Sequence, residues 1–203
     1  MNQTSTNHLI IFCKNPVLGR CKTRLAASIG PEKALAVYQF LLSHTAKVTS
    51  KVSAKRIVFY SHEPIDDDVF DSRYFHKDGQ EGDDLGERMA NALRKSFANG
   101  AKKVIIIGSD LYDISSELIE HGFKALETHQ TVIGPAKDGG YYLIGMNGTN
   151  SEVFKGKNWG TSSVLQDTLS NLNPDLTFLL DEKNDIDQLE DLHPEEIFKP
   201  LIS

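Results

Sequence analysis

The stretch Val104-Ile105-Ile106-Ile107-Gly108-Ser109-Asp110 decides the fold class of this 203-residue chain. Four β-branched apolar residues in a row are typical of a strand buried on both faces, as in the interior of a parallel sheet. The run stops at Gly108-Ser109-Asp110, before a helical pattern begins near Ser115. Ligands of open α/β sheets lie beyond the carboxyl ends of the strands, so Asp110 stands at a candidate site. A simple turn-capping role is the alternative.

The composition is that of an ordinary globular protein, with 39% hydrophobic and 25% charged residues. At this length a single domain over residues 1–203 is the simplest expectation. No apolar run approaches the roughly 20 residues that a bilayer crossing needs, and the N-terminus lacks the basic start of a signal peptide. Cys13 and Cys21 are too few for a disulfide framework. We therefore expect a cytoplasmic protein with free thiols, whose oligomeric state the sequence does not fix.

The charge of one loop differs from that of the protein as a whole. The net charge of −6 argues against nucleic-acid polymers and membranes as partners. Lys14, Arg20, Lys22 and Arg24 nevertheless fall close together, with no acidic residue between them. In an acidic protein this cluster is where a small polyanion would bind, although a solvated basic loop is the alternative.

The basic cluster follows a second buried strand, His8–Cys13. Pro16 and Gly19 interrupt regular structure, so Asn15–Leu25 is expected to be a loop at the carboxyl end of that strand. Its spacing fits neither the Walker A pattern nor G-x-G-x-x-G. The loop can still offer backbone N–H groups, guanidinium groups and ammonium groups to phosphates.

Alternating helix and strand patterns continue along the chain and predict an α/β fold. Gln80 and Gly82 precede a predicted helix start, where backbone donors can face an anion or a base. The predicted elements are a helix from Pro31 that serves only packing, a strand Arg56–Tyr60, a helix opened by the Asp84/Glu87 capping box, a hairpin of Thr131–Pro135 and Tyr141–Met146, a helix capped by Thr161 and a last strand Leu176–Leu180.

Two further sequences carry candidate chemistry. The hairpin turn Asp138-Gly139-Gly140 needs no function, but its adjacent glycines would let a ligand approach the backbone closely. Asp185 and Asp187 follow the last predicted strand. Together with Asp110 they can converge on one hard cation with oxygen ligands, as Mg²⁺ prefers.

The chain resembles the GT-A-fold sugar-nucleotide transferases and nucleotidyltransferases. More closely, it resembles a bacterial group of small glycosyltransferase-like proteins (DUF2064-like) that neighbour the phospholactate guanylyltransferases. The pieces that carry this resemblance occur in the family's order and span nearly the whole chain: Pro16–Leu25, Gln80–Met89, Gly108–Asp110, Gly134–Gly145, Trp159–Thr161 and Asp185–Asp187.

The resemblance implies a three-layer α/β/α sandwich whose mostly parallel mixed sheet binds a nucleotide over its amino-terminal half. By position, Asp110 would be the first ligand of Mg²⁺ or Mn²⁺ and Asp185 or Asp187 the second. The remaining candidate site residues are Lys22 and Arg24 for phosphates, Gly19, Gln80 and Gly82 on the nucleotide side, and Asp138, Gly139 and Gly140 on the acceptor side, with Asp110, Asp138 and Lys22 as the catalytic set.

The favoured function is metal-assisted glycosyl transfer from a nucleotide-diphospho-sugar to a small-molecule acceptor that the sequence does not identify. Nucleotidyl transfer of the phospholactate guanylyltransferase type is the first alternative. The loop Asn15–Leu25 carries only a reduced version of the glycine-rich loop of those enzymes, which counts against chemistry that releases pyrophosphate. A non-catalytic nucleotide-binding module is the second alternative.

Overall fold

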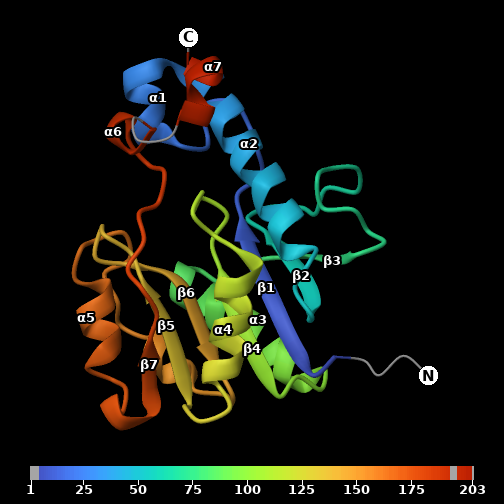
Figure 1. The fold of residues 1–203 in the computed structure, drawn as a ribbon, viewed down its shortest axis with the longest axis vertical. Helices are drawn as coiled ribbons and strands as arrows, with labels where there is room; N and C mark the ends of the chain where they lie inside the picture. Colours follow the sequence, from blue (N-terminus) through green and yellow to red (C-terminus); the bar gives the residue numbers. More distant parts are fainter. Residues whose placement is uncertain (1–4, 193–195, 203) are drawn as a thin grey trace.

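A seven-stranded mixed sheet forms the centre of the molecule (Figure 1). The computed structural model describes residues 5–192 and 196–202. The strands lie in the order β3-β2-β1-β4-β6-β5-β7. Their bounds are β1 Asn7–Cys13, β2 Lys55–Tyr60, β3 Phe75–Gly79, β4 Lys103–Ile107, β5 Thr131–Pro135, β6 Tyr141–Met146 and β7 Thr177–Leu179.

Helices flank this sheet and extend beyond one of its edges. The α-helices are α1 Thr23–Ile29, α2 Pro31–Thr49, α3 Leu85–Ala98, α4 Ser116–Ala125, α5 Val164–Leu169, α6 Leu189–Leu192 and α7 Lys199–Ile202. Short 3₁₀ turns complete the described elements: η1 Ser151–Phe154, η2 Pro174–Leu176 and η3 Glu196–Phe198.

Strand direction decides where the site forms. β1, β2, β3 and β4 pair in parallel, and β5 pairs in parallel with β7, whereas β6 runs antiparallel to both of its neighbours. The carboxyl ends of the parallel strands therefore meet at one edge, together with the amino end of β6. The segments after β1, β4, β5 and β7 all start at this edge, which we call the carboxyl edge.

The predicted interior strand is confirmed. β4 lies between β1 and β6, with Val104 opposite His8 and Ile107 opposite Ile11 in the parallel pair. The four residues Val104–Ile107 are all buried, as their apolar run predicts. The prediction of a three-layer α/β/α fold with a mostly parallel sheet is also confirmed.

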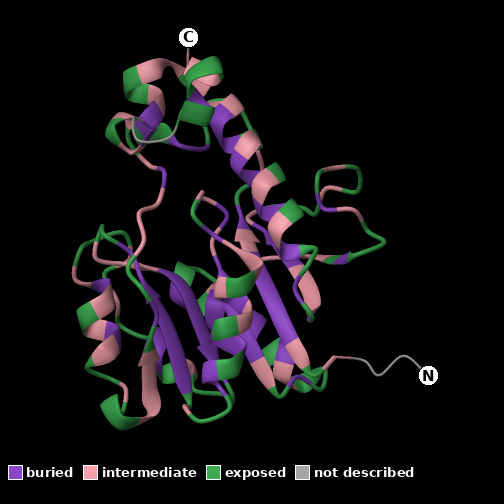
Figure 2. Ribbon diagram, viewed as in Figure 1, coloured by how far each residue is buried: buried purple, intermediate pink, exposed green. Residues whose placement is uncertain are grey.

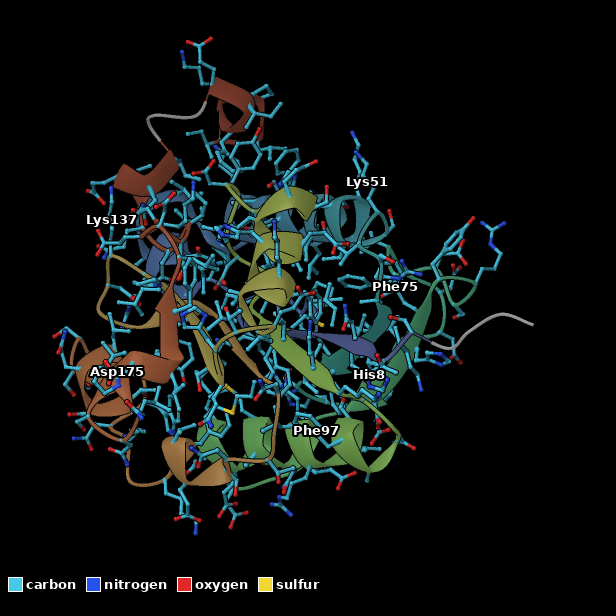
Figure 3. All side chains as sticks on the ribbon, turned by 60° about the horizontal axis from the view of Figure 1, so that its bottom comes forward. His8, Lys51, Phe75, Phe97, Lys137 and Asp175 are labelled. Carbon is cyan, nitrogen blue, oxygen red and sulfur yellow. The ribbon has the colours of Figure 1, made fainter. Side chains whose placement is uncertain are left out.

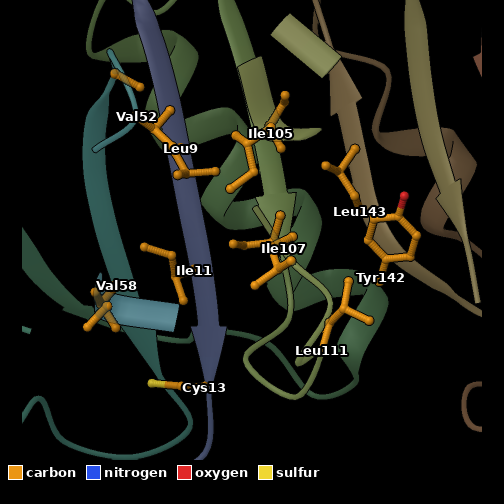
Figure 4. Packing of buried hydrophobic residues seen from close by; sticks show 14 of the residues in the cluster. Leu9, Ile11, Cys13, Val52, Val58, Ile105, Ile107, Leu111, Tyr142 and Leu143 are labelled. Carbon is orange, nitrogen blue, oxygen red and sulfur yellow. The ribbon is translucent and has the colours of Figure 1, made fainter. Parts of the chain in front are cut away.

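Alternation along the strands divides the core between the two faces of the sheet. Leu9, Ile11, Ile105 and Ile107 point to the face covered by α2 and α4 (Figure 4). Residues between them, such as Ile10, point to the other face, where they pack against Met89 and Leu93 of α3 and against the segment around Phe154. The buried residues follow the central strands in Figure 2.

A smaller apolar cluster lies beyond the carboxyl edge. Leu25 of α1, Val37 and Leu41 of α2, and Leu192 of α6 pack together there, around Phe198. Figure 1 shows α1, α6 and α7 gathered around the first turns of α2. This helical group covers the end of the sheet at which the predicted site residues lie.

Several local predictions were wrong. The loop expected over Asn15–Leu25 ends early, because α1 begins at Thr23. β3 was not predicted, since its sequence Phe-His-Lys-Asp-Gly is mostly polar, as suits a half-exposed edge strand. The last strand is shorter than expected because Pro174–Leu176 form a 3₁₀ turn.

The cap of α5 was also misassigned. Ser163, not Thr161, precedes the first helical residue, and no side chain caps the helix. The hydroxyl of Thr161 instead donates a hydrogen bond to the carbonyl of Asn158. The Asp84 cap of α3 is confirmed, since its carboxylate accepts from the backbone N–H of Glu87.

Two further expectations concern the chain as a whole. Cys13 and Cys21 are free and buried, as predicted. None of the helices in the described ranges combines the length and apolar character that a bilayer crossing requires.

Buried His8 generates a prediction about stability. Its side chain is 2% exposed and its Nδ1 atom has no hydrogen-bond partner among the described residues. Burial, with smaller contributions from Lys55 and His76, lowers its pKa from 6.5 to about 4. Between pH 6.5 and about 4, His8 is therefore protonated in the unfolded chain but remains neutral in the folded protein. The free energy of unfolding consequently falls as the pH drops toward 4.

We expect urea unfolding of the wild type to show a loss of roughly 2 to 3 kcal/mol over this pH interval that is absent in His8→Leu. His62→Gln, at an exposed histidine, is the matched control and should keep the wild-type profile. An identical pH profile in wild type and His8→Leu would contradict the prediction.

Candidate functional site

Two adjoining cavities lie along the carboxyl edge of the sheet. The larger has a volume of about 570 Å³ and the smaller about 240 Å³, and they share Phe12, Leu85 and Gly108 as a common wall. Among the predicted site residues, Lys22, Arg24, Gln80, Asp110 and Asp187 line the larger cavity. Asp138, Gly140 and Asp185 line the smaller one.

An ion pair between a buried lysine and a half-exposed aspartate lies at the end of β4. The Lys22 ammonium donates a hydrogen bond to Asp110 Oδ2 at 3.0 Å, and the lysine side chain is only 5% exposed. Lys22 has a backbone φ of 49° and is, within the described residues, the non-glycine residue with positive φ. Such a left-handed conformation costs about 1 to 2 kcal/mol and clusters at functional sites. The backbone is strained at the residue that brings its cation to Asp110.

The charges of the two neighbouring carboxylates differ. Burial opposes the charge of Asp110, but attraction and hydrogen bonding from Lys22 outweigh it and hold the pKa of Asp110 below its ordinary value. Burial, with repulsion from Asp110 as the next cause, raises the pKa of Asp185 to about 8. Asp185 Oδ1 is buried without a hydrogen-bond partner among the described residues. Asp185 is therefore a carboxyl group that lacks a cation or a donor.

Asp187 is engaged by basic side chains. Its Oδ2 accepts from Arg24 Nη1 at 2.9 Å, and its Oδ1 lies 3.9 Å from Lys22 Nζ. Arg24 is 63% exposed, so this pair adds little to stability. Its effect is to place the guanidinium group at the rim of the larger cavity.

The carboxyl groups at this edge would supply only part of the ligand set of a metal ion. Within residues 5–192 and 196–202, no three His, Cys, Asp or Glu side chains are grouped so that they could hold a metal ion. Mg²⁺ is usually held by one or two carboxylates together with substrate phosphates, however. The orphaned oxygen of Asp185 beside Asp110 fits such a shared site, with phosphate oxygens completing the shell.

Tyr38 organises the centre of the larger cavity, a role that the sequence did not indicate. Its hydroxyl donates to the carbonyl of Lys14, accepts from the backbone N–H of Lys14, and lies 3.2 Å from the hydroxyl of Ser109. It thereby ties the loop after β1 to the residue before Asp110. In the sequence, the helical spacing of Tyr38 already explained it as a core residue. No further feature of the sequence indicated that its hydroxyl would form hydrogen bonds at the site.

The predicted nucleotide-side residues are only partly brought together. Gln80 lines the larger cavity, but its amide Nε2 donates to the carbonyls of Cys13 and Phe59. Gly82 lies outside the lining, and its carbonyl accepts from Arg88 Nε. Gly19 lies in an exposed turn, also outside the lining.

Two further cations line the larger cavity. Lys14 and Arg88 have no ion-pair partner within the described residues. Arg20, the remaining member of the predicted basic cluster, is exposed and does not line the cavity. The cations that line the cavity therefore come from the loop after β1, from the first turn of α1 and from the first turn of α3.

The hairpin turn Asp138-Gly139-Gly140 packs against a neighbouring segment and also borders the smaller cavity. Asp138 Oδ1 accepts from the backbone N–H of Gly140 at 2.8 Å. Gly139 has φ +87°, and a Cβ atom there would lie 2.3 Å from the carbonyl oxygen of Ser162. The need for glycine at position 139 is thus explained by the approach of the 161–163 segment, whereas Gly140 borders the smaller cavity.

Trp159 forms part of the smaller cavity and packs edge-on against Tyr141, with ring centroids 6.5 Å apart. A Cβ atom at Gly86 would lie 2.9 Å from the indole and 2.4 Å from the carbonyl oxygen of Phe154. The first turn of α3 therefore packs directly against the indole ring. The Trp-Gly-Thr sequence supported the resemblance, but no role for its side chains could be assigned from it.

Comparison with known proteins places the chain in a family. Residues 44–161, more than half of the chain, match the family described as "Uncharacterized protein conserved in bacteria (DUF2064)". The chain belongs to this family. The matched range includes Asp110, Asp138 and Trp159 but ends before Asp185. Among curated proteins, none matches the chain.

Solved structures agree with this placement. A protein described as a "putative nucleotide-diphospho-sugar transferase" from Desulfovibrio desulfuricans G20 is 31% identical, with a TM-score of 0.87 over 97% of this chain and 89% of that chain. The similarity confirms the prediction from the sequence that the chain has a nucleotide-diphospho-sugar transferase-like fold.

More distant structures share the fold alone. The 4-diphosphocytidyl-2C-methyl-D-erythritol synthase of Anaerococcus prevotii DSM 20548 is 11% identical, with a TM-score of 0.58 over 95% of each chain. Glucosyl-3-phosphoglycerate synthase of Mycobacterium tuberculosis, in complex with Mn²⁺, uridine diphosphate and glucosyl-3-phosphoglycerate, is 13% identical. Its TM-score is 0.51 over 89% of this chain and 71% of that chain.

The strained backbone of Lys22 gives a prediction that separates conformation from charge. Lys22→Ala and Lys22→Gly both remove the ammonium group, but only glycine adopts φ 49° without a steric penalty. We expect Lys22→Gly to be more stable than Lys22→Ala by about 1 kcal/mol, measured by urea unfolding. The same pair of substitutions at Thr23, within α1, should show the opposite order, because glycine weakens a helix. Equal stability of the two Lys22 variants would show that the backbone there is unstrained.

Proposed function

We propose that the protein is a metal-dependent transferase that uses a nucleotide-activated donor, and that the reaction is glycosyl transfer from a nucleotide-diphospho-sugar to a small acceptor. The observation that carries this proposal is the ion pair between buried Lys22 and Asp110. It lies close to Asp185, whose Oδ1 has no hydrogen-bond partner among the described residues, and between a basic cavity and a largely apolar one. The description of the 31%-identical relative supports the same class of donor.

The larger cavity suits the nucleotide. Its volume of about 570 Å³ lies within the usual range for small-molecule sites. Lys14, Lys22, Arg24 and Arg88 line it, and such cations bind phosphate oxygens through charge-assisted hydrogen bonds. In this proposal the diphosphate lies against these side chains and points its leaving oxygen toward Asp110.

Mg²⁺ or Mn²⁺ would be held by Asp110 and Asp185, with Asp187 close enough to contribute. Bound there, the cation would neutralise charge that develops on the diphosphate. Lys22 shares that task from the protein side, because its ammonium group is fixed at the end of β4. The carboxyl proton that the raised pKa of Asp185 retains near pH 7 would leave when a cation binds.

The transfer step itself is assigned to the boundary between the cavities. The hydroxyl oxygen of the acceptor attacks the anomeric carbon of the sugar, and the bond between that carbon and the diphosphate oxygen breaks. The nucleoside diphosphate leaves with the electron pair, and the hydroxyl proton passes to the carboxylate of Asp138. In nucleotidyl transfer the broken bond would instead release pyrophosphate, so the product identifies the reaction.

Phosphate binding by Lys22 and Arg24 can be tested with Arg20, a member of the same basic cluster, as the control. We expect Lys22→Met and Arg24→Gln each to weaken the binding of a nucleoside diphosphate at least tenfold, since each removes a charge-assisted hydrogen bond of roughly 1.5 to 3 kcal/mol. Arg20→Gln removes the same charge as Arg24→Gln from a position four residues earlier that does not line the cavity, and should leave the affinity unchanged. Isothermal titration calorimetry measures all three. Equal losses in Arg20→Gln and Arg24→Gln would mean that the cluster acts only through its overall charge.

The metal role of Asp110 is tested by the dependence of nucleotide binding on Mg²⁺. Wild type should bind a nucleoside diphosphate at least tenfold more tightly with Mg²⁺ than with a chelator. Asp110→Asn should lose this difference while keeping the fold, which circular dichroism checks. Asp138→Asn, on the acceptor side, should keep it. Binding of the wild type that is equally tight in chelator would refute the metal assignment.

A further inference from the structure

The two adjoining cavities differ sharply in charge. Cationic side chains line the larger one, as described above. In the smaller cavity, none of the lining residues, all of which lie in the described part of the chain, is Lys, Arg or His. Its charge-bearing side chains are the carboxyl groups of Asp138 and Asp185. The shared wall of Phe12, Leu85 and Gly108 therefore separates a cavity that contains Lys and Arg side chains from one whose ionisable groups are carboxyl groups.

The rest of the smaller cavity is apolar and partly aromatic. Phe12, Tyr141 and Trp159 contribute rings, and aliphatic side chains such as Ile144 and Val164 complete the wall. Aromatic walls favour flat ligands, which can stack or pack edge-on. The face of an indole also attracts cations. A ligand with a flat apolar body therefore fits the shape and the chemistry of this wall.

The carboxyl groups leave acceptor positions open at one end of this cavity. Asp138 uses Oδ1 for the backbone N–H of Gly140, and within the described residues no donor reaches its Oδ2. Asp185 Oδ1 is buried without a partner. A hydroxyl or an ammonium group can donate to these oxygens. An anionic group beside Asp138 would meet a carboxyl group and no Lys, Arg or His side chain of the lining, and would lose its hydration without compensation.

We propose that the smaller cavity takes an uncharged or cationic acceptor with a flat apolar body, and that it discriminates against phosphorylated and carboxylated acceptors. This inference deepens the transferase proposal and rests on it for the identification of the ligand as the acceptor. It disfavours transfer to an anion such as phospholactate, because no Lys, Arg or His side chain of the lining would pair with that acceptor beside Asp138.

Trp159 gives a direct readout, since it is the single tryptophan of the chain and lines the cavity. Four small probes share one flat body: benzylamine, benzyl alcohol, benzoate and phenyl phosphate. Titrations followed by Trp159 fluorescence, without nucleotide or metal, should show benzylamine binding most tightly and benzyl alcohol next. Both anions should bind at least tenfold more weakly than benzyl alcohol. Anions that bind as tightly as benzyl alcohol, or no response to any probe, would overturn the proposal.

Substitutions at Asp138 distinguish the effect of the cavity on probe binding from the effect of the overall charge of the protein. Asp138→Asn should remove most of the preference for benzylamine over benzyl alcohol, and Asp138→Lys should allow phenyl phosphate to bind. Asp175, labelled in Figure 3, is exposed in η2 before β7, at the opposite edge of the sheet. Asp175→Asn and Asp175→Lys change the net charge by the same amounts as the corresponding substitutions at Asp138. They should leave the order of the probe affinities unchanged. Equal effects at positions 138 and 175 would refute a role for the cavity.

The two proposals fail in different ways. Calorimetry of a nucleoside diphosphate with Mg²⁺ is carried out on the same preparations as the probe titrations. Nucleotide binding together with a preference for anionic probes would leave the transferase standing and reject the acceptor class. The predicted order of probes without any nucleotide binding would reject the transferase, and with it the identification of the cavity as an acceptor site.

Discussion

The contact between the Lys22 ammonium and the Asp110 carboxylate ties together parts of the molecule that are otherwise far apart in sequence. Asp110 ends the central strand, whereas Lys22 starts α1, which packs with α2 and α6 beyond the carboxyl edge. The pair thus fastens the helical group to the sheet. Because the Lys22 side chain is buried, loss of Asp110 would leave a buried charge without its partner, which is strongly destabilising. The strained backbone at Lys22 is maintained by this arrangement.

The same contact sets the charges of its neighbours. Lys22 holds the pKa of Asp110 below its ordinary value, and burial together with repulsion from Asp110 raises the pKa of the nearby Asp185 to about 8. In the proposed reaction a cation between these two carboxyl groups would complete the site. The basic side chains on one side and the carboxyl groups on the other would then direct donor and acceptor to different cavities.

Much of the fold could be predicted from the sequence because its signals are local. The apolar run Val104–Ile107 specifies an interior strand, and the position of Asp110 after that strand places it at the carboxyl edge. The edge strand β3 escaped notice because its mostly polar sequence resembles a loop. The boundaries of α5 and of the last strand also depend on turns that the chain pattern does not specify.

The site was harder to predict because its contacts are long-range. Lys22 could be recognised as a basic residue near a strand end, but its left-handed backbone and its pairing with Asp110 appear only in three dimensions. Tyr38 satisfied a helical pattern so well that its hydrogen bonds to Lys14 gave no trace in the sequence. Gly139 carried a signal for close approach, but the approaching group proved to be the backbone of Ser162.

The antiparallel course of β6 has a consequence for how such a site can diversify. Because β6 reverses the chain at the carboxyl edge, one wall of the smaller cavity is a short hairpin loop, and its tip residues Lys137 and Asp138 are exposed. Surface loops accept changes of sequence and length more readily than the strands they join. Evolution can therefore rebuild the proposed acceptor side of this scaffold by altering a few loop residues, while the basic segments around the adjoining cavity at the same edge of the sheet remain as they are.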